Sequence, residues 1–446
     1  MNSDSTKRGT YFIQTFGCQM NERDSETIAG MLEKDGYVKA GERDGSDVIV
    51  INTCSVRENA DNRFFGQLGV IKKIKEKNPD SIVAVCGCMM QQKRVTDIIK
   101  EKYSWVDIIF GTMNIAEFPE LLRERRERGQ HEYLIADSMD HITEGLPSKR
   151  KYKFKSFVNI MNGCNNFCTY CIVPYTRGRE KSRTPEAILS EIRTLAGDGV
   201  KEVTLLGQNV NSYGKADGFD SDFADLLYKI NEVDGIERIR FMTSHPKDVS
   251  DKLINAFGEL EKLCSHIHLP VQSGSSRLLK KMNRRYTKEQ YLDLLARLRE
   301  ARNGIAVTTD IIVGFPGETD EDFEETLDLV RKARFDSAFT FLYSKREGTP
   351  AAKYEDQIPD DVKHERFNRL VDELNAITAE KNAAYEGRVE KVLIEGRSAR
   401  GGEGVCSGRT DTFKLVNFEC DESRAGQMAD VRITEAGTFS LYGELV

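Results

Sequence analysis

The chain has 446 residues, of which 31% are charged and 39% hydrophobic, and its formal net charge is −7. This length allows about three domains, and the composition is typical of a soluble globular protein. No stretch of about 18 apolar residues occurs, and residues 1–9 lack the apolar run of a secretory signal. Ten cysteines in such a chain indicate metal or redox chemistry rather than disulfides. We therefore expect a cytoplasmic protein without a membrane span.

Residues 9–129 alternate between strand-like and helical patterns and are expected to form a first domain. Apolar runs typical of buried parallel strands cover residues 11–16, 48–51, 82–85 and 106–110. Helical patterns cover residues 22–35, 56–77, 91–102 and 116–128. This order predicts a small open parallel α/β sheet.

Each of the first three predicted strands is followed by a cysteine, namely Cys18, Cys54 and Cys88. Because ligands of open α/β sheets bind beyond the carboxyl ends of the strands, we expect these three thiols to converge. One such cysteine would more often be an ordinary buried thiol, but three at equivalent positions predict a cluster site with three ligands. Cys86 lies close to Cys88, so spacing alone leaves the choice open; we assign Cys86 to the core.

Residues 130–149 show weak periodicity and are expected to form a linker. The next predicted domain, residues 150–382, contains six strand-and-helix alternations and ends in a long helical stretch from residue 360. Its strands are expected near residues 157–161, 202–207, 238–243, 266–271, 307–313 and 338–343. Six units are too few for an eightfold barrel, so we expect a partial TIM-like (β/α)6 barrel whose site lies at the carboxyl ends of its strands.

Cys164, Cys168 and Cys171 follow the first of these strands in the pattern C-x3-C-x2-C. A four-iron cluster usually takes four cysteines, so three leave one iron open. An open coordination position is typical of a reactive metal site. Zinc usually requires C-x2-C pairs and four ligands, and no fourth Cys or His lies nearby. The pattern therefore favours a reactive iron–sulfur cluster.

This loop resembles the signature of the radical S-adenosylmethionine (SAM) enzymes, in which an aromatic residue, here Tyr170, precedes the third cysteine. In that superfamily the open iron binds SAM, and one electron splits SAM into methionine and a 5′-deoxyadenosyl radical. The stretch 314–318, Gly-Phe-Pro-Gly-Glu, resembles the motif beside the adenine of SAM. From this resemblance and the polar residues at the strand ends, we expect SAM contacts at Tyr170, Gln208, Asn209, Ser244, Gln272, Ser273, Gly314, Gly317 and Glu318.

Residues 383–446 contain strand-like stretches at 389–395, 412–416, 430–434 and 440–446, joined by Gly-rich turns. This pattern predicts a small β-barrel of the OB-like kind. The segments 408–411 and 414–416 resemble the TRAM RNA-binding module. Because this segment is net acidic, any RNA-binding face on it must be local. Further candidates are basic residues that follow the loop of Cys164, Cys168 and Cys171. The full set of candidates for RNA contact is Arg177, Arg179, Arg183, Arg409 and Lys414.

The order of the three predicted domains resembles the methylthiotransferase family from end to end. Four motifs resemble its MiaB-type branch, at residues 17–21, 52–57, 175–180 and 207–214. The resemblance implies that the chain methylthiolates carbon 2 of N6-isopentenyladenosine at position 37 of tRNA, giving 2-methylthio-N6-isopentenyladenosine. It also implies that one SAM donates a methyl group to sulfur on an auxiliary cluster, while a second SAM generates the radical that abstracts hydrogen.

The same resemblance implies two [4Fe–4S] clusters and SAM as cofactors. The auxiliary cluster is expected on Cys18, Cys54 and Cys88, and the radical-SAM cluster on Cys164, Cys168 and Cys171. Expected partners are the modified tRNA, a reducing electron donor and an iron–sulfur carrier that resupplies sulfur. We expect the protein to be a monomer.

Three alternatives stay open at this point. Two other branches of the family share the plan, one acting on N6-threonylcarbamoyladenosine in tRNA and one on an aspartate of a ribosomal protein. The third is a non-enzymatic iron–sulfur RNA-binding redox regulator, which the cysteine loop at the end of a barrel strand disfavours. Incubation with SAM and a reductant distinguishes a regulator from an enzyme, because a regulator makes no 5′-deoxyadenosine.

Overall fold

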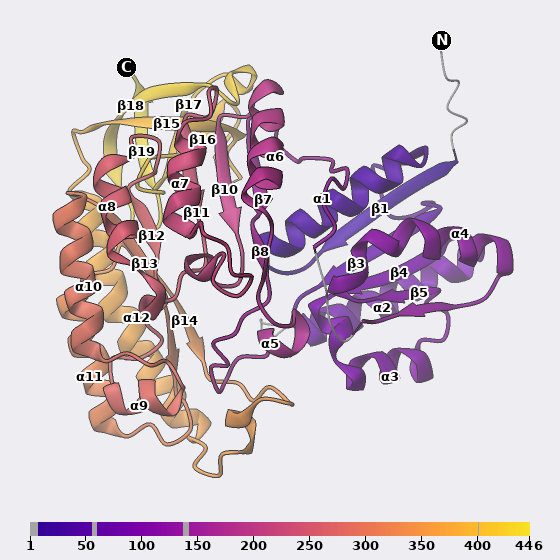
Figure 1. Ribbon diagram of the computed structural model, residues 1–446, viewed down its shortest axis with the longest axis horizontal. Helices are drawn as coiled ribbons and strands as arrows, with labels where there is room; N and C mark the ends of the chain where they lie inside the picture. The colour runs from indigo at the N-terminus through magenta and orange to yellow at the C-terminus, as the bar shows by residue number, and fades with distance from the viewer. Residues whose placement is uncertain (1–7, 56–59, 137–141, 400) are drawn as a thin grey trace.

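The computed structural model describes residues 8–55, 60–136, 142–399 and 401–446. Figure 1 shows an open sheet with helices on both faces, then a curved sheet covered by helices on its outside, then a small closed barrel. The predicted fold class, an open α/β sheet, a partial barrel and a small β-barrel, is confirmed. Val56 and Arg57, in the predicted helix 56–77 and the motif 52–57, lie outside the described residues. None of the described helices is long and apolar enough to span a membrane.

The N-terminal sheet has six parallel strands in the order β2-β1-β3-β4-β5-β6. Its strands are β1 (Gly9–Thr15), β2 (Tyr37–Lys39), β3 (Val48–Thr53), β4 (Ile82–Gly87), β5 (Ile108–Phe110) and β6 (Glu132–Leu134). The four predicted strands correspond to β1, β3, β4 and β5. The short edge strands β2 and β6 were missed because three partly exposed residues give no clear apolar run. β6 pairs with β5, although its residues were expected to lie in the linker.

Helices cover both faces of this sheet. α1 (Gln19–Lys34) and α4 (Phe118–Arg128) pack on one face, and α2 (Ala60–Lys77) and α3 (Lys93–Lys102) pack on the other. Every residue of β3 and β4 is therefore buried, as both faces of these central strands meet helices. The carboxyl ends of β1, β3 and β4 lie at one edge of the sheet, since the three strands are neighbours and parallel.

The central domain contains six parallel strands in two arcs, as predicted. The arcs join through an isolated bridge between Ile239 and Leu263. The strands are β7 (Lys155–Asn159), β10 (Glu202–Leu206), β11 (Arg238–Phe241), β12 (His266–His268), β13 (Ala306–Val313) and β14 (Ser337–Leu342). The larger helices on the outside are α6 (Pro185–Gly197), α7 (Phe223–Asn231), α8 (Asp251–Glu259), α10 (Lys288–Ala301), α11 (Asp320–Ala333) and α12 (Asp360–Ala383).

Short elements surround the carboxyl ends of these strands. They are the hairpin of β8 (Met161–Asn162) and β9 (Lys181–Ser182), and the helices α5 (Val173–Thr176) and α9 (Ser276–Lys281). The 3₁₀ helices among the described residues are η1 (Cys88–Gln91), η2 (Thr112–Glu117), η3 (Val210–Ser212), η4 (Pro246–Asp248), η5 (Pro350–Lys353) and η6 (Glu422–Arg424).

The C-terminal strands close into a five-stranded barrel in the order β15-β16-β17-β19-β18. They are β15 (Val389–Arg397), β16 (Val405–Arg409), β17 (Leu415–Glu419), β18 (Met428–Ala436) and β19 (Leu441–Leu445). β16 was missed because its Cys-Ser-Gly sequence has little strand propensity. Two buried arginines of β11 fix this barrel to the central domain. Arg238 donates to the carbonyl oxygens of Arg409 and Lys391, and Arg240 to those of Thr410 and Asp411.

Candidate active site between two cysteine trios

The loop that carries Cys164, Cys168 and Cys171 begins directly after β8, at Gly163. Gly163 has a φ of +80°, and a Cβ atom there would lie 2.1 Å from the carbonyl oxygen of Arg179, so only glycine fits. Cys164 and Cys168 are buried and Cys171 is half-buried. The amide of Cys171 donates to the carbonyl oxygen of Cys168 at 2.9 Å, which turns the loop back on itself. The three thiols therefore lie together at the carboxyl end of the first barrel strands.

Residues that follow α9 hold this loop in place. The amide of Thr169 donates to the carbonyl oxygen of Met282 at 3.0 Å. The side-chain amide of Asn283 donates to the carbonyl oxygens of Asn166 and Phe167, at 3.0 and 3.1 Å. The loop shape is thus set by a segment more than a hundred residues later in the chain.

Arg284 places a buried positive charge beside the loop. Its Nη1 lies 3.6 Å from the sulfur of Cys168, and its Nη2 donates to the carbonyl oxygen of Pro270 at 2.6 Å. Burial by itself would lower the pKa of this guanidinium, but the nearby acidic groups of Tyr170, Tyr286 and Cys168 raise it well above its ordinary value. Arg284 therefore stays charged next to the trio, a role that the sequence analysis did not assign.

The second trio lies at the carboxyl edge of the N-terminal sheet, as predicted from the strand ends. Cys18 caps the start of α1, Cys54 follows β3, and Cys88 begins η1 after β4. The pKa of Cys18 falls to about 6, chiefly because its thiol hydrogen-bonds with Cys54, with a contribution from the nearby positive charge of Arg177. Cys86 points into the core beneath α1 and α4, so it does not belong to this group.

Arg177 links the segment that follows the first cysteine loop to the second trio. It follows α5, close to the radical-SAM-like loop, but its Nε donates to the sulfur of Cys88 at 3.2 Å and its Nη2 to Asp24 at 2.8 Å. Figure 1 shows α5 between the central and N-terminal domains. Arg177 is only 7% exposed. It therefore contacts the second cysteine site instead of RNA, which corrects the prediction.

Several buried polar atoms at the carboxyl ends of the barrel strands have no hydrogen-bond partner among the described residues. They belong to Asn159, Asn162, Asn209, Asn211, Ser244, His245 and Tyr343. Buried polar groups in proteins are nearly always hydrogen-bonded, so such a group of orphaned atoms indicates a polar ligand. Asn209 and Ser244 are among the SAM contacts predicted from the sequence, whereas Asn159, Asn162, His245 and Tyr343 were not named there.

The remaining predicted SAM contacts fall into two sets. The ring of Tyr170 meets that of Phe315 in the 314–318 motif edge-on, with centroids 6.5 Å apart. Gln208 accepts a hydrogen bond from the amide of Gly163. Gln272 is buried at the end of the fourth strand with a φ of +72°. These three side chains lie close to the cysteine loop or to the strand ends.

Ser273, Gly314, Gly317 and Glu318 take part in internal packing. The hydroxyl of Ser273 accepts from the amide of Ser275 at 3.1 Å. Glu318 accepts from the amide of Gly314 at 3.0 Å and pairs with Arg366 of α12 at 2.9 Å. Burial raises the pKa of Glu318 to about 7. The Glu318 side chain therefore shapes the 314–318 turn, and its Oε1 atom is occupied by protein groups.

The other predicted RNA contacts also differ in exposure. Arg183 is 8% exposed and pairs with Glu144 and Glu191, which corrects its assignment to an RNA surface. Arg179 is exposed and lies over the ring of Phe167, 4.4 Å from its centroid. Of the three predicted RNA contacts that follow the loop, Arg179 is therefore the exposed one.

Arg409 and Lys414 lie where the C-terminal barrel meets the central domain. Lys414 is paired with Asp336 at 3.5 Å, and its side chain is 10% exposed. Arg409 is half-buried and stacks on Phe413, 4.4 Å from the ring centroid. Lys414 therefore pairs across the contact between the two domains, which corrects its assignment to an RNA face, whereas the Arg409 side chain packs on its own domain and its RNA contact stays a prediction.

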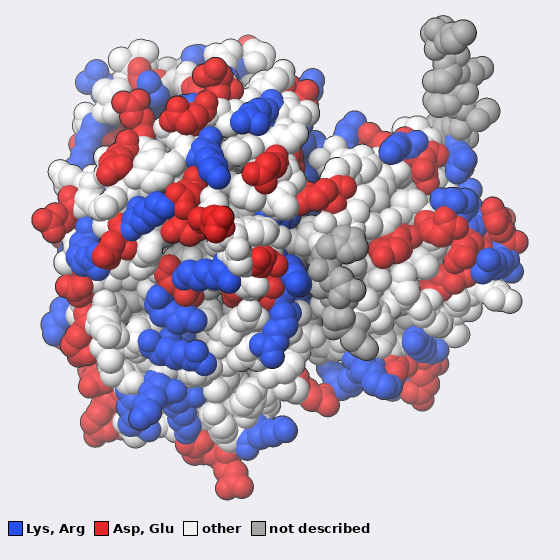
Figure 2. Space-filling view, in the orientation of Figure 1, with Lys and Arg blue, Asp and Glu red and all other residues white. Residues whose placement is uncertain are grey.

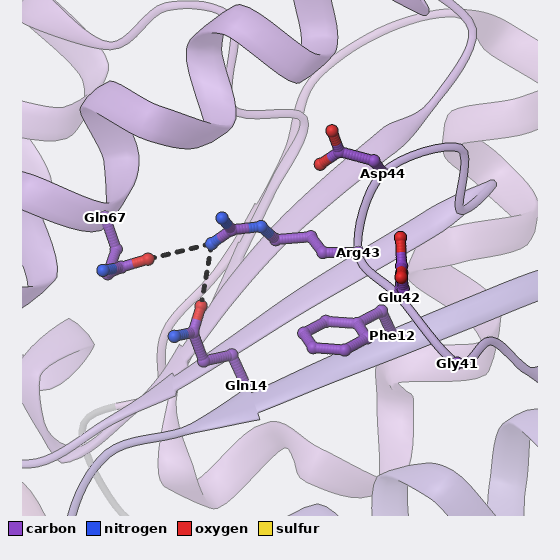
Figure 3. A pocket seen from close by; sticks show the side chains of 7 residues that line it. All are labelled: Phe12, Gln14, Gly41, Glu42, Arg43, Asp44 and Gln67. Atoms are coloured by element: carbon purple, nitrogen blue, oxygen red, sulfur yellow. Dashed lines mark hydrogen bonds between the residues drawn. The ribbon is translucent and has the colours of Figure 1, made fainter.

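A cavity of about 390 Å³ lies on the N-terminal domain, beside β1 and the loop after β2. Figure 3 shows Arg43 reaching across it to the side-chain oxygens of Gln14 and Gln67, at 3.2 and 2.8 Å. Phe12 and the acidic Glu42 line its other side. None of the six candidate cysteines lines this cavity.

The two trios suit iron–sulfur clusters by the chemistry of their thiols. Burial raises the pKa of Cys164 and of Cys171 to about 12 and also raises that of Cys88. Stable thiolates there need strong positive charge, which bound iron supplies. Among the described residues, no three Cys, His, Asp or Glu side chains are arranged to hold a single metal ion. A four-iron cluster differs in that each thiolate binds a separate iron.

Three family models match the chain. A model of the radical SAM superfamily matches residues 158–330, and a model of the TRAM domain matches residues 383–446. A third, described as Uncharacterized protein family UPF0004, matches residues 10–111. With the cysteine loop at the carboxyl end of a partial barrel, these matches define a radical SAM enzyme that carries an additional N-terminal domain and a TRAM domain. This superfamily implies a [4Fe–4S] cluster and SAM.

Relatives resemble the chain along its whole length. A tRNA-2-methylthio-N(6)-dimethylallyladenosine synthase of Clostridium botulinum (strain Loch Maree / Type A3) is 57% identical over 436 residues, covering 98% of this chain and 97% of the relative. Synthases of the same name from Clostridium tetani and Clostridioides difficile are each 55% identical, covering 100% and 99% of this chain and 98% and 92% of theirs. The chain belongs to this family of methylthiotransferases.

Solved structures resemble the fold. The radical SAM methyltransferase TsrM from Kitasatospora setae superposes with a TM-score of 0.57 at 15% identity, covering 77% of this chain and 74% of its own. The cobalamin-dependent SAM radical enzyme OxsB gives a TM-score of 0.53 at 14% identity, covering 80% and 56%. At these identities the likeness concerns the fold alone.

Proposed function

We propose that this chain methylthiolates carbon 2 of N6-isopentenyladenosine, the dimethylallyladenosine of the relatives' name, at position 37 of tRNA. The observation that carries the proposal is the hydrogen bond of Arg177, which follows the loop of one cysteine trio, to Cys88 of the other trio. The end-to-end identity with synthases named for this modification selects the nucleoside.

Each trio has its own part in this proposal. Cys164, Cys168 and Cys171 hold the cluster that works on SAM, and Cys18, Cys54 and Cys88 hold an auxiliary cluster. When bound, the first supplies the electron that cleaves SAM to a 5′-deoxyadenosyl radical, and the second supplies sulfur carrying a methyl group from another SAM. Such chemistry suits the C–H bond at carbon 2 of adenine, which no acid, base or nucleophilic side chain opens. A reducing electron donor and a source of replacement sulfur complete the reaction.

The chain's own groups orient the reactants. The orphaned atoms of Asn209, Asn211 and Ser244 lie at adjacent strand ends, where they can bind the polar groups of SAM. His245 accepts from the amide of Lys247 through Nδ1, so its Nε2 carries the proton and can donate to the SAM carboxylate. Burial lowers the pKa of His245, which keeps the ring neutral. Arg177 and Arg284 hold positive charge beside the two sets of thiolates.

The target base has to enter the space between the trios, so it has to leave its stack. Bases in RNA loops are partly unstacked already, which lowers the cost of this step. Because Arg238 and Arg240 bond the TRAM domain directly to the central domain, RNA held by one domain keeps a fixed position relative to the other.

A comparison of substrates tests the proposed nucleoside. Reconstituted protein is incubated with SAM and reductant, and with isopentenylated tRNA, threonylcarbamoylated tRNA or the ribosomal protein, and the products are analysed by mass spectrometry. We expect a methylthio product only on isopentenylated tRNA. Product on only one of the other substrates would reassign the chain within the family, and absence of 5′-deoxyadenosine would favour a regulator.

Variants of the trios test the division of labour. Changing Cys164, Cys168 and Cys171 to Ala should abolish cleavage of SAM. Changing Cys18, Cys54 and Cys88 to Ala should leave formation of 5′-deoxyadenosine but remove the methylthio product, because no methylated sulfur is available. A methylthio product from the second variant would show that sulfur does not pass through the N-terminal site.

A further inference from the structure

A small cavity of about 50 Å³ lies between the N-terminal domain and the loop that follows β14. Its polar lining comes from both sides of this junction: Ser55, Gln92, Arg94, Lys345, Arg346 and Glu347. Gln92 donates to the hydroxyl of Ser55 at 2.9 Å, which fixes the N-terminal wall. Arg94 pairs with Glu347 across the junction at 3.0 Å. The cavity thus exists only because the two domains are in contact.

Among the described residues that line the cavity, three are cations and one, Glu347, is a carboxylate. Glu347 is bonded to Arg94, and its side chain is 74% exposed. Lys345 is exposed and makes no hydrogen bond or ion pair with any residue that the structure describes. A compact, strongly hydrated ammonium without a partner, beside two guanidiniums, is suited to an anion such as phosphate.

The cavity also lies next to both cysteine trios. Ser55 directly follows Cys54, and Ile172, which forms part of the wall, directly follows Cys171. A base held between the trios would have its own sugar and phosphate within one nucleotide of this cavity. The position therefore matches the backbone of the target nucleotide.

We propose that this cavity binds a backbone phosphate of the RNA, adjacent to the adenosine that is modified. The inference rests on the proposed function, because it takes the target base to lie between the trios. Lys345 and Arg346 are positioning residues here: they neutralise the phosphate and so set how far the base enters the site. Phosphate contacts of this kind fix the position of the RNA on the protein but do not recognise its base sequence.

RNA fits this cavity better than an acidic partner protein. The cavity is small and concave, as a single phosphate requires, whereas a protein surface would need a broad contact area. The central domain carries further exposed cations, among them Arg277, Lys280 and Arg285 in and after α9. Figure 2 shows Lys and Arg side chains gathered on the visible face of the central domain, where it borders the N-terminal domain. A phosphate chain can follow such a basic surface.

The first test measures the salt dependence of RNA binding. Binding of an isopentenylated anticodon stem-loop is followed by fluorescence anisotropy across a salt series for the full-length protein, Lys345→Gln and Lys77→Gln. Lys77 is a matched control because it is exposed but lies at the end of α2, away from the carboxyl edge of the sheet. We expect Lys345→Gln to weaken binding about tenfold at low salt and to reduce the salt slope by about 1. We expect Lys77→Gln to change neither.

The second test locates the phosphate. Stem-loops with a single uncharged methylphosphonate at each position around the target adenosine are compared on the full-length protein and on Lys345→Gln. If the cavity binds one phosphate, methylphosphonate at that position weakens binding to the full-length protein but has little further effect on Lys345→Gln. In the same way, methylphosphonate at that position should have little further effect on RNA binding by Arg346→Gln.

Three outcomes would overturn the inference. Unchanged affinity and salt slope in Lys345→Gln would remove Lys345 from the RNA site. If the effect of Lys345→Gln on RNA binding simply adds to the effect of methylphosphonate at every position, Lys345 attracts the RNA only at long range and contacts no single phosphate. Normal RNA binding with slower reduction by an acidic electron-donor protein would make the cavity a protein-docking site. A failure of the proposed function differs from these, since the isopentenylated RNA would then not bind specifically to any variant or would bind without being modified.

Discussion

At the scale of single residues, two buried arginines accompany the two cysteine trios. Each costs desolvation energy and is stabilised only by the acidic groups around it. Arg177 is held by Asp24 and Cys88, and Arg284 by Tyr286 and the carbonyl oxygen of Pro270. Removal of one partner from such a group leaves the other buried without a counter-charge, which costs more than the pair itself contributes.

We expect Arg177→Ala to lower the free energy of unfolding by about 3 to 5 kcal/mol, because Asp24 would be left buried and unpaired. Urea denaturation measures this loss. Arg193→Ala, at an exposed position of α6, serves as a control and should change stability by less than about 0.5 kcal/mol. Adding Asp24→Ala to Arg177→Ala should recover part of the loss. A double-variant loss equal to the sum of the losses of Arg177→Ala and Asp24→Ala alone would show that the pair is not coupled.

Gly163 allows a second test at this scale. Gly163→Ala should cost about 3 kcal/mol or more, because it combines a positive φ with a clash against the carbonyl oxygen of Arg179. The same change should slow SAM cleavage about a hundredfold, since the cysteine loop would be displaced. Gly199→Ala is the matched control: Gly199 has a φ of +87°, but no atom lies within 4 Å of the position that a Cβ would take, so only about 1 to 2 kcal/mol is expected. Equal effects of the two variants on SAM cleavage would contradict this account.

At the scale of elements, β11 connects the central domain to the TRAM domain. Arg240 is 2% exposed, pairs with Glu202 at 2.9 Å and donates to two TRAM carbonyl oxygens. These bonds run from a barrel strand into the turn after β16, so one side chain satisfies groups on both domains. The TRAM domain is thereby held as an extension of the barrel.

Arg240→Ala should loosen this contact, because Glu202 and the carbonyl oxygens of Thr410 and Asp411 would lose their partner. We expect faster proteolysis near residues 383–388 and weaker tRNA binding. Arg397→Ala removes a charge from an exposed position of the same domain and should leave both unchanged. If Arg240→Ala is cleaved no faster than Arg397→Ala, Arg240 does not fix the TRAM domain.

At the scale of the whole molecule, we expect the interface between the central and TRAM domains to respond to pH. His266 is buried there and stacks on Phe413, with ring centroids 4.9 Å apart. Burial and the surrounding cations Arg240, Arg409 and Lys414, together with His268, keep the pKa of His266 well below its ordinary value. The folded protein therefore holds this ring uncharged, whereas the unfolded chain protonates it below about pH 6.5.

The sign of the pH effect follows from that difference. The stabilisation is fully present above the unfolded pKa of about 6.5 and is lost as the pH falls, at about 1.4 kcal/mol per pH unit for this group. Urea denaturation between pH 7 and pH 5 should show this slope. His266→Gln should reduce the slope, whatever its effect on stability at pH 7. An identical slope in both proteins would mean that His266 does not titrate as described.

The sequence by itself determined the fold class and the positions of the six candidate cysteines at strand ends. Both depend on local patterns, since an apolar run sets where a parallel strand ends, and the residue after it then lies at the carboxyl edge. The short strands β2, β6 and β16 were not predicted from the sequence. Each has few residues, most of them partly exposed, so none shows a clear hydrophobic pattern.

Only the tertiary structure decided which charged and polar groups surround those cysteines. Arg177 contacts Cys88, which is 89 residues away in the sequence, and Arg284 contacts Cys168, which is 116 residues away. No local sequence pattern can therefore predict either contact. For the same reason the basic residues Arg177, Arg183 and Lys414 read as an RNA surface in the sequence but are buried in ion pairs in the fold. Whether a charged side chain is exposed or paired depends on the residues that pack against it, and those residues come from distant segments of the folded chain.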